Sequence, residues 1–290
     1  MLEEPRLRSV SCLHPGGLHR MAYWEWGDPA AAQTIVCVHG LTRQGRDFDH
    51  LARDLSQRAR VICPDVVGRG RSDWLRDPNA YAVPTYVADM VTLLARLDVE
   101  QVDWVGTSMG GLIGIGVAAL EGSPVRRLVL NDVGPRIQPE ALVRIGGYVG
   151  QGGRWPTEEA AAQAMWALST GFGPHSPQQW LELSRPLLKP DGEGGFMLRY
   201  DPALSVPLKA ITPQLAAAGE AMLWHVYDSL RCPTLLLRGA QSDLLSAETA
   251  QAMTQRGPRA RLHSFEGVGH APTLVQPDQR AVVSEFLLSP

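Results

Sequence analysis

The sequence predicts an α/β fold: a mainly parallel central sheet, helices on both of its faces, and one inserted helical segment. Short apolar runs alternate with segments of helical periodicity, as expected when helices connect parallel strands. This alternation stops over residues 134–229 and then resumes. At 290 residues, with 44% hydrophobic and 20% charged side chains, the chain is long enough and apolar enough for one large core with an insertion.

The strand candidates are short and apolar. Residues 18–26 carry three aromatic side chains and end at the turn 27–29. Residues 34–38 (TIVCV) are apolar or β-branched throughout, which is typical of a strand buried on both faces. The later candidates are 60–63, 102–106, 127–130, 234–237 and 260–265, the last of which alternates like an edge strand.

The helix candidates place apolar side chains three and four residues apart. Residues 109–120 are small and apolar on all sides, which predicts a buried helix. The others are 48–57, 83–97, 158–168, 213–223, 247–254 and 277–288. We therefore expect a core formed by residues 1–133 and 230–290, and a helical cap formed by residues 134–229, where no buried-strand run occurs.

Charge, targeting signals and cysteine usage exclude several classes of protein. The net charge is −3, and nucleic-acid binding needs clustered positive charge. The run Gly68-Arg69-Gly70-Arg71 is short, and we interpret it as a solvated loop within the scaffold turn 64–72. No apolar stretch approaches a membrane span or an export signal, so no membrane partner is expected. The four cysteines lack metal-binding spacing and favour the cytoplasm.

Ser108 is the candidate nucleophile. It lies in GTSMGG (106–111), between an expected buried strand and an expected helix. A residue on so tight a strand-to-helix turn is held above the sheet in a strained conformation, and glycines two residues before and after it remove colliding side chains. The helix N-terminus directs free N–H groups to the same point. The context therefore favours catalysis over a structural turn.

His270 is the candidate base, because a serine hydroxyl needs a proton acceptor to become a nucleophile. It lies in a glycine-containing loop, GVGHAP (267–272), between the last expected strand and the last helix. The imidazole needs a carboxylate to orient it. We favour Asp243, which follows the strand 234–237, over Asp132, which follows the strand 127–130. The backbone N–H groups of Leu41 and Met109 are the candidate oxyanion-hole donors.

These segments together resemble the α/β-hydrolase superfamily, most of all its capped serine carboxylesterase branch, over nearly the whole chain. The matching segments are VHGLTRQGRDFDHLA, PDVVGRGRS, GTSMGGLIG, LRGAQSDLL and GVGHAP. The resemblance implies a catalytic triad of Ser108, Asp243 and His270, and an oxyanion hole at Leu41 and Met109. The sequence has neither a glycine-rich phosphate loop after a first strand nor a metal-binding motif, so we expect no cofactor and no metal. Serine at the turn argues against haloalkane dehalogenases and epoxide hydrolases, which carry aspartate there.

We therefore expect a carboxylic ester hydrolase that acts on small-molecule or polymeric esters through an acyl-enzyme. Similar capped bacterial esterases include some that degrade aliphatic polyesters. Two alternatives stay open. One is a carbon–carbon bond hydrolase, whose acidic substrate would need a cation such as Arg144, Arg154 or Arg199 in the cap. The other is a ligand-binding protein on a hydrolase scaffold, which would acylate slowly without recycling.

Overall fold

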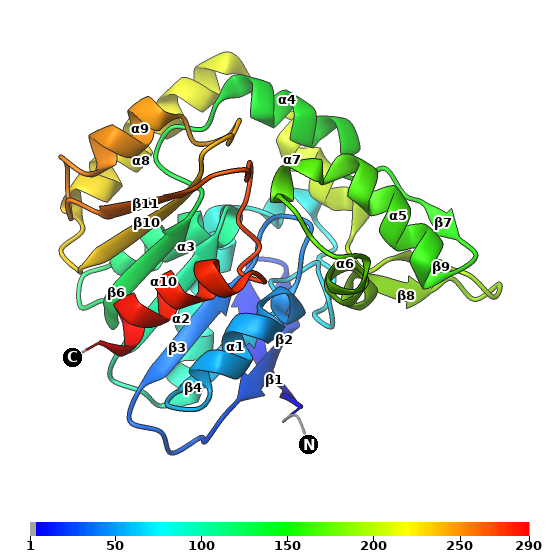
Figure 1. The fold of residues 1–290 in the computed structure, drawn as a ribbon, viewed down its shortest axis with the longest axis horizontal. Helices are drawn as coiled ribbons and strands as arrows, with labels where there is room; N and C mark the ends of the chain where they lie inside the picture. The colour runs from blue at the N-terminus through cyan, green and yellow to red at the C-terminus, as the bar shows by residue number, and fades with distance from the viewer. Residues whose placement is uncertain (1–3, 290) are drawn as a thin grey trace.

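The structure is a computed structural model that describes residues 4–289. Its centre is a sheet of eight strands in the order β1-β2-β4-β3-β5-β6-β10-β11 (Figure 1). Neighbouring strands are parallel from β4 to β11, and β2 pairs antiparallel with both β1 and β4. The strands are β1 (Arg6–His14), β2 (Gly17–Trp26), β3 (Thr34–Val38), β4 (Arg60–Pro64), β5 (Val102–Thr107), β6 (Val125–Asn131), β10 (Thr234–Gly239) and β11 (Arg261–Phe265). The predicted fold class is confirmed. Strand β1 was not predicted, because most of its side chains face solvent.

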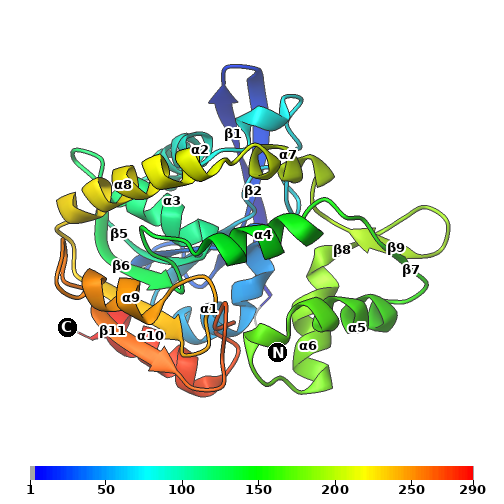
Figure 2. The ribbon, with the colours of Figure 1, turned by 90° about the horizontal axis from the view of Figure 1, so that it is seen from above.

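Helices cover both faces of the sheet. Figure 2 shows α2, α3 and α8 on one side and α1 and α10 on the other. Helices α1 and α10 pack Leu51, Leu55, Val283 and Leu287 into one fully buried apolar cluster with the sheet. The helices of the core are α1 (Asp49–Leu55), α2 (Val83–Leu97), α3 (Met109–Ala118), α9 (Ala247–Met253) and α10 (Pro277–Leu288), with the short 3₁₀ helices η1 (Gly45–Phe48) and η2 (Pro78–Ala80).

The segment between β6 and β10 lies over one edge of the sheet and beside it (Figure 1). Its helices are α4 (Pro139–Tyr148), α5 (Glu158–Leu168), α6 (Pro177–Ser184), α7 (Ser205–Lys209) and α8 (Pro213–Ser229), with the 3₁₀ helices η3 (Thr170–Phe172), η4 (Arg185–Leu187) and η5 (Pro202–Leu204). Helix α8 returns to the core, where the Tyr227 hydroxyl donates to the Met253 carbonyl at 2.9 Å.

The insertion, predicted as helical, also contains short strands that the sequence did not reveal. They form a small antiparallel sheet in the order β7-β9-β8, made of β7 (Arg154–Trp155), β9 (Phe196–Leu198) and β8 (Leu188–Pro190). Strands of two or three residues are too short for a period of two to be visible in the sequence.

The register of the large sheet brings four carboxyl ends to one edge. Val38 of β3 lies opposite Gly106 of β5. Asn131 of β6 lies opposite both Thr107 of β5 and Leu237 of β10. The loops that follow these strands therefore converge at this edge.

Among the helices of residues 4–289, none is long and apolar enough to cross a membrane.

Candidate active site

Ser108 occupies a sharp turn between β5 and α3. Its backbone has φ 52° and ψ −118°, a region that side-chain-bearing residues rarely adopt and that costs about 1–3 kcal/mol. A hydrogen bond from its N–H to the Asn131 carbonyl, at 3.0 Å, fixes the turn to β6. A Cβ on Gly106 would overlap the Gly110 carbonyl, and one on Gly110 would overlap the Val38 carbonyl. The spacing of glycines around Ser108 is therefore a steric requirement of the turn.

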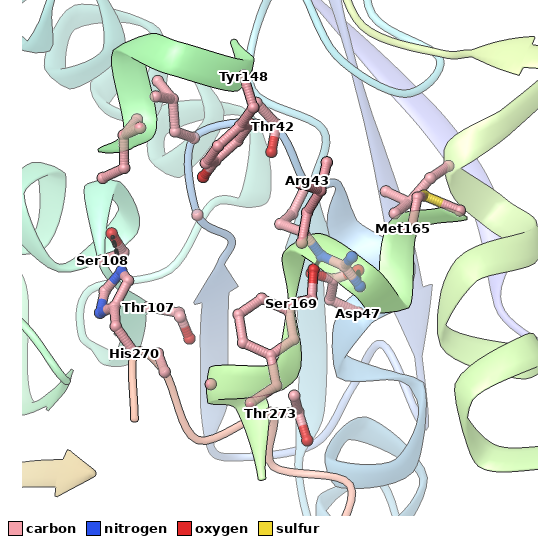
Figure 3. Close-up of a pocket in the computed structure, with 18 of the residues that line it drawn as sticks. Thr42, Arg43, Asp47, Thr107, Ser108, Tyr148, Met165, Ser169, His270 and Thr273 are labelled. Carbon is pink, nitrogen blue, oxygen red and sulfur yellow. Dashed lines mark hydrogen bonds and ion pairs between the residues drawn. The ribbon is translucent and has the colours of Figure 1, made fainter. Parts of the chain in front are cut away.

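His270 lies beside Ser108, in the loop between β11 and α10 (Figure 3). Its Nε2 is 3.0 Å from Ser108 Oγ, and its Nδ1 is 2.7 Å from Asp132 Oδ2. The structure thus brings the predicted nucleophile and the predicted base into hydrogen-bond contact. A carboxylate on Nδ1 keeps the proton there, which leaves Nε2 free to accept the serine proton.

Asp132 is fully buried directly after β6. Its Oδ1 accepts the Gly239 N–H at 2.9 Å. Its Oδ2 accepts from the Ser242 hydroxyl at 2.6 Å in addition to His270. Three hydrogen bonds from fixed donors hold the carboxylate in one direction. Asp132, the weaker of the two candidates in the sequence, therefore occupies the position of the orienting acid.

The expected contact between Asp243 and His270 does not form, and we correct it. Asp243 forms a bidentate ion pair with Arg144 of α4 at 2.6 and 2.8 Å, and its side chain is 45% exposed. The cause is the turn after β10. The Ser242 hydroxyl accepts the N–H groups of Leu244 and Leu245 while it donates to Asp132, and both leucine side chains are buried. Asp243 is thereby paired with Arg144 at the wall of the pocket instead of with His270.

The two candidate oxyanion-hole residues flank Ser108. Within residues 4–289, the backbone N–H groups of Leu41 and Met109 donate to no other protein group. Met109 is the first residue of α3, where N–H groups have no partner inside the helix. Gly40, which precedes Leu41, lies beside Ser108: a Cβ there would be in ordinary van der Waals contact with the serine Cβ, at 3.7 Å. Both residues therefore have backbone N–H groups that are free to donate to a ligand, and their role as oxyanion-hole donors stays a prediction.

His39 orders the loop that follows β3. It is fully buried, and burial lowers the pKa of its imidazole to about 3. Its Nε2 accepts the Val66 N–H at 3.0 Å, and its Nδ1 lies 2.7 Å from the Gly40 carbonyl. Because the backbone N–H can only donate, Nε2 carries no proton and Nδ1 donates. His39 is therefore a neutral structural residue.

A pocket of about 580 Å³ opens above Ser108, between the core and the segment from β6 to β10. Its walls mix apolar side chains with hydroxyl groups, as Figure 3 shows for Met165, Tyr148, Ser169 and Thr273. Of the three arginines proposed for an acidic substrate, Arg144 lines the pocket. The other two are engaged elsewhere: Arg154 pairs with Glu193, and Arg199 donates to the Leu188 carbonyl.

Cys12, His19 and Asp89 form a group of potential metal ligands in residues 4–289, with ligand atoms within 4.8 Å of one another. His19 Nε2 already contacts Asp89 Oδ2 directly at 2.9 Å, whereas two ligand atoms on tetrahedral zinc are about 3.3 Å apart. Burial also raises the pKa of the Cys12 thiol to about 12, which opposes the thiolate that zinc needs. We interpret the group as a buried polar cluster between the β1–β2 hairpin and α2.

Comparisons with known proteins agree with this geometry. The family model described as the alpha/beta hydrolase fold matches residues 33–277. A 3-hydroxybutyrate-oligomer hydrolase of Cupriavidus necator is 54% identical over 99% of both chains. A 2-hydroxy-6-oxo-2,4-heptadienoate hydrolase of Pseudomonas putida is 26% identical over 84% of both. The crystal structure of an alpha/beta hydrolase from Novosphingobium aromaticivorans is 35% identical, covers 99% of both chains and has a TM-score of 0.87.

Proposed function

We propose that this chain, which belongs to the alpha/beta hydrolase fold family, hydrolyses ester bonds in oligomers of 3-hydroxybutyrate through an acyl-enzyme on Ser108. The observation that carries the proposal is the line of contacts from Asp132 to His270 to Ser108, at 2.7 and 3.0 Å. The substrate class comes from the relative that is 54% identical over 99% of both chains.

The contacts define a sequence of proton transfers. His270 Nε2 takes the Ser108 proton as Oγ attacks the ester carbonyl, while Asp132 stabilises the imidazolium. The oxyanion accepts the N–H groups of Leu41 and Met109. His270 then protonates the alkoxide oxygen of the leaving group, and the shortened product leaves with a free hydroxyl group. Water, deprotonated by His270, attacks the acyl-enzyme, and the returning proton restores Ser108.

The pocket supports this substrate class. An oligomer of 3-hydroxybutyrate repeats a polar ester group and a small methyl branch, so it needs hydrogen-bond donors interspersed with apolar surface. The pocket offers hydroxyl groups of Thr42, Thr107, Tyr148, Ser169, Thr170 and Thr273. Ile145, Met165, Phe172 and Leu198 supply apolar surface beside them. A volume of about 580 Å³ also falls within the usual range of small-molecule sites.

We propose further that residues 134–229 serve as a cap over a core formed by residues 1–133 and 230–290. Ser108, Asp132 and His270 come from the proposed core, whereas Tyr148 and Met165 come from the proposed cap. All four cysteines are free, which supports the cytoplasm as the compartment.

The test measures by chromatography the release of 3-hydroxybutyrate units from a purified linear trimer. We expect wild-type turnover and a loss on the order of 10⁴-fold or more in Ser108→Ala, with unchanged thermal unfolding. Ser264→Ala, an exposed serine on β11, is the matched control and should retain full activity. Full activity in Ser108→Ala would overturn the mechanism.

The same proteins are assayed with a 2-hydroxy-6-oxo-dienoate. Turnover of the dienoate without turnover of the trimer would replace the proposal by carbon–carbon bond hydrolysis, the activity in the name of the Pseudomonas putida relative. A stable acyl-enzyme that forms once and does not recycle would instead support the ligand-binding alternative.

A further inference from the structure

We propose that Arg69 is a positioning residue for the oxyanion hole: its buried cation fixes the two donor residues and places a positive charge behind them. The inference rests on the proposed function of Ser108. It also corrects the sequence interpretation of residues 68–71 as a solvated loop, because the Arg69 side chain is fully buried.

One guanidinium group touches both candidate donor residues. Arg69 Nε donates to the Leu41 carbonyl at 2.7 Å, and Nη2 lies 3.3 Å from Met109 Sδ. Leu41 lies in the loop after β3, whereas Met109 directly follows Ser108 as the first residue of α3. A bond to the Leu41 carbonyl restricts rotation of that residue and so the direction of its own N–H. A displacement of Arg69 would therefore misalign the donors without removing either of them.

Further contacts fix the position of the Arg69 guanidinium group. Its Nη1 donates to the Val67 carbonyl at 2.7 Å and to the Tyr86 hydroxyl at 3.0 Å. The rings of Tyr86 and Tyr81 lie 5.0 and 5.8 Å from the guanidinium carbon, within the range of cation–π attraction. Four of the five N–H donors thus have partners fixed within the protein, which makes the group rigid. Rigidity is what distinguishes a preorganised site from one that must rearrange during the reaction.

The charge of Arg69 has no carboxylate partner. In residues 4–289, no carboxylate oxygen lies within 4.0 Å of its guanidinium nitrogens. Asp65, in the same turn, instead accepts the backbone N–H groups of Gly45 and Arg71. Burial of an unpaired charge is costly, and carbonyl groups and aromatic faces offset only part of that cost. The negative charge that develops on the substrate oxygen would supply the missing counter-charge in the transition state.

The turn that carries Arg69 also reaches the pocket wall. The Gly70 N–H donates to the Arg199 carbonyl at 3.1 Å, and the Asp201 N–H donates to the Gly68 carbonyl at 2.8 Å. Tyr200, between these two residues, lines the pocket. Residues 64–72 therefore link the loop after β3 to the segment that forms the opposite wall.

The test compares Arg69→Met and Arg69→Lys with wild type on p-nitrophenyl butyrate. We expect Arg69→Met to lower kcat by about 10²-fold, as the loss of one oxyanion-hole donor does, with KM changed less than about threefold. Affinity for a phenylboronic acid, which forms a tetrahedral adduct with the serine, should fall by a similar factor. Arg69→Lys keeps the charge but not all the hydrogen bonds, so its kcat should be about tenfold higher than that of Arg69→Met.

Arg60→Met is the matched control, because Arg60 is also largely buried but lies at the opposite end of the sheet, paired with Glu25. It should lower the melting temperature and leave kcat and boronate affinity unchanged. Folded Arg69→Met with wild-type kcat and boronate affinity would overturn the proposal. If Arg69→Met does not fold, Arg69→Lys is the deciding variant. Wild-type kcat and boronate affinity in Arg69→Lys would also overturn the proposal.

The choice of ester separates this inference from the substrate assignment. A wild-type protein that cleaves p-nitrophenyl butyrate but not hydroxybutyrate oligomers would refute the substrate and leave the Arg69 measurements valid. Activity of Ser108→Ala on the same ester would refute the proposed function itself, whatever the Arg69 variants do.

Discussion

Exchange of Asp132 for Asn is the change that separates the two candidate acids most sharply, with Asp243→Asn as its matched partner. The structure fixes how an amide at residue 132 must orient. The Gly239 N–H can only donate, so the amide oxygen faces Gly239 and the NH₂ group faces His270. His270 Nδ1 must then accept a hydrogen bond. Its proton moves to Nε2, which points at Ser108 and can no longer take the serine proton.

The magnitude follows from this change of tautomer. A base in the wrong tautomer loses about 10³–10⁴-fold in kcat, which corresponds to about 4–5 kcal/mol of transition-state stabilisation. Asp243→Asn removes a partner of Arg144 in an ion pair whose side chains are 41% and 45% exposed. Exposed pairs contribute about 0–1 kcal/mol, so kcat should change by less than about fivefold.

The assay is kcat on p-nitrophenyl butyrate, with the melting temperature of each variant as the check of folding. The reasoning requires that Asp132→Asn is folded and nearly inactive while Asp243→Asn is folded and active. An inactive Asp243→Asn beside an active Asp132→Asn would refute it and restore the acid favoured by the sequence. Loss of activity in both variants would show that the ion pair with Arg144 also supports catalysis.

Further predictions concern the turn at Ser108 and the buried His39. Gly110→Ala should lower the free energy of unfolding by about 3 kcal/mol or more, because the new methyl group overlaps the Val38 carbonyl. Gly219→Ala, on α8, adds its methyl group in open space and should raise the free energy of unfolding by about 0.5–1 kcal/mol. Urea unfolding measures both, and equal effects would contradict the steric argument. Burial lowers the pKa of His39 to about 3, below its value of about 6.5 in the unfolded chain, so the unfolded state binds more protons between these values. Stability should therefore fall as pH drops from about 6.5, by up to about 1.4 kcal/mol per pH unit. His39→Gln should flatten this dependence between about pH 7 and about pH 4.5, and an unchanged slope would exclude His39 as its source.

Local sequence patterns were sufficient for the elements of the core and for the nucleophile. The runs TIVCV and VDWVG are buried strands, and the predicted bounds of the helix at 83–97 agree with α2. Ser108 was identifiable because the turn sterically requires the glycines around it. This requirement is visible in the local sequence. His270 was identifiable because its loop joins the last strand to the last helix.

The small sheet in the segment between β6 and β10 could not be predicted in the same way. Strands β7 to β9 contain only two or three residues each. Strand β9 pairs locally with β8, but its pairing with β7 joins segments more than thirty residues apart. The aromatic residues of that segment do not share one role. Trp155 and Phe172 line the pocket, whereas Trp180 is buried in an apolar cluster against which Phe172 also packs.

The sequence by itself determined the fold class, the strained turn of Ser108 and the chemistry expected there, because each depends on periodicity or on neighbouring residues. Only the tertiary structure decided which acid meets His270. Asp132 and Asp243 both follow strands that are neighbours in the sheet, and the burial of Leu244 and Leu245 leaves Asp243 paired with Arg144 instead of His270. The same holds for Arg69: a charged residue in a glycine-rich turn indicates solvent, and only the packing of two tyrosines and the Leu41 carbonyl around it places that charge inside the protein.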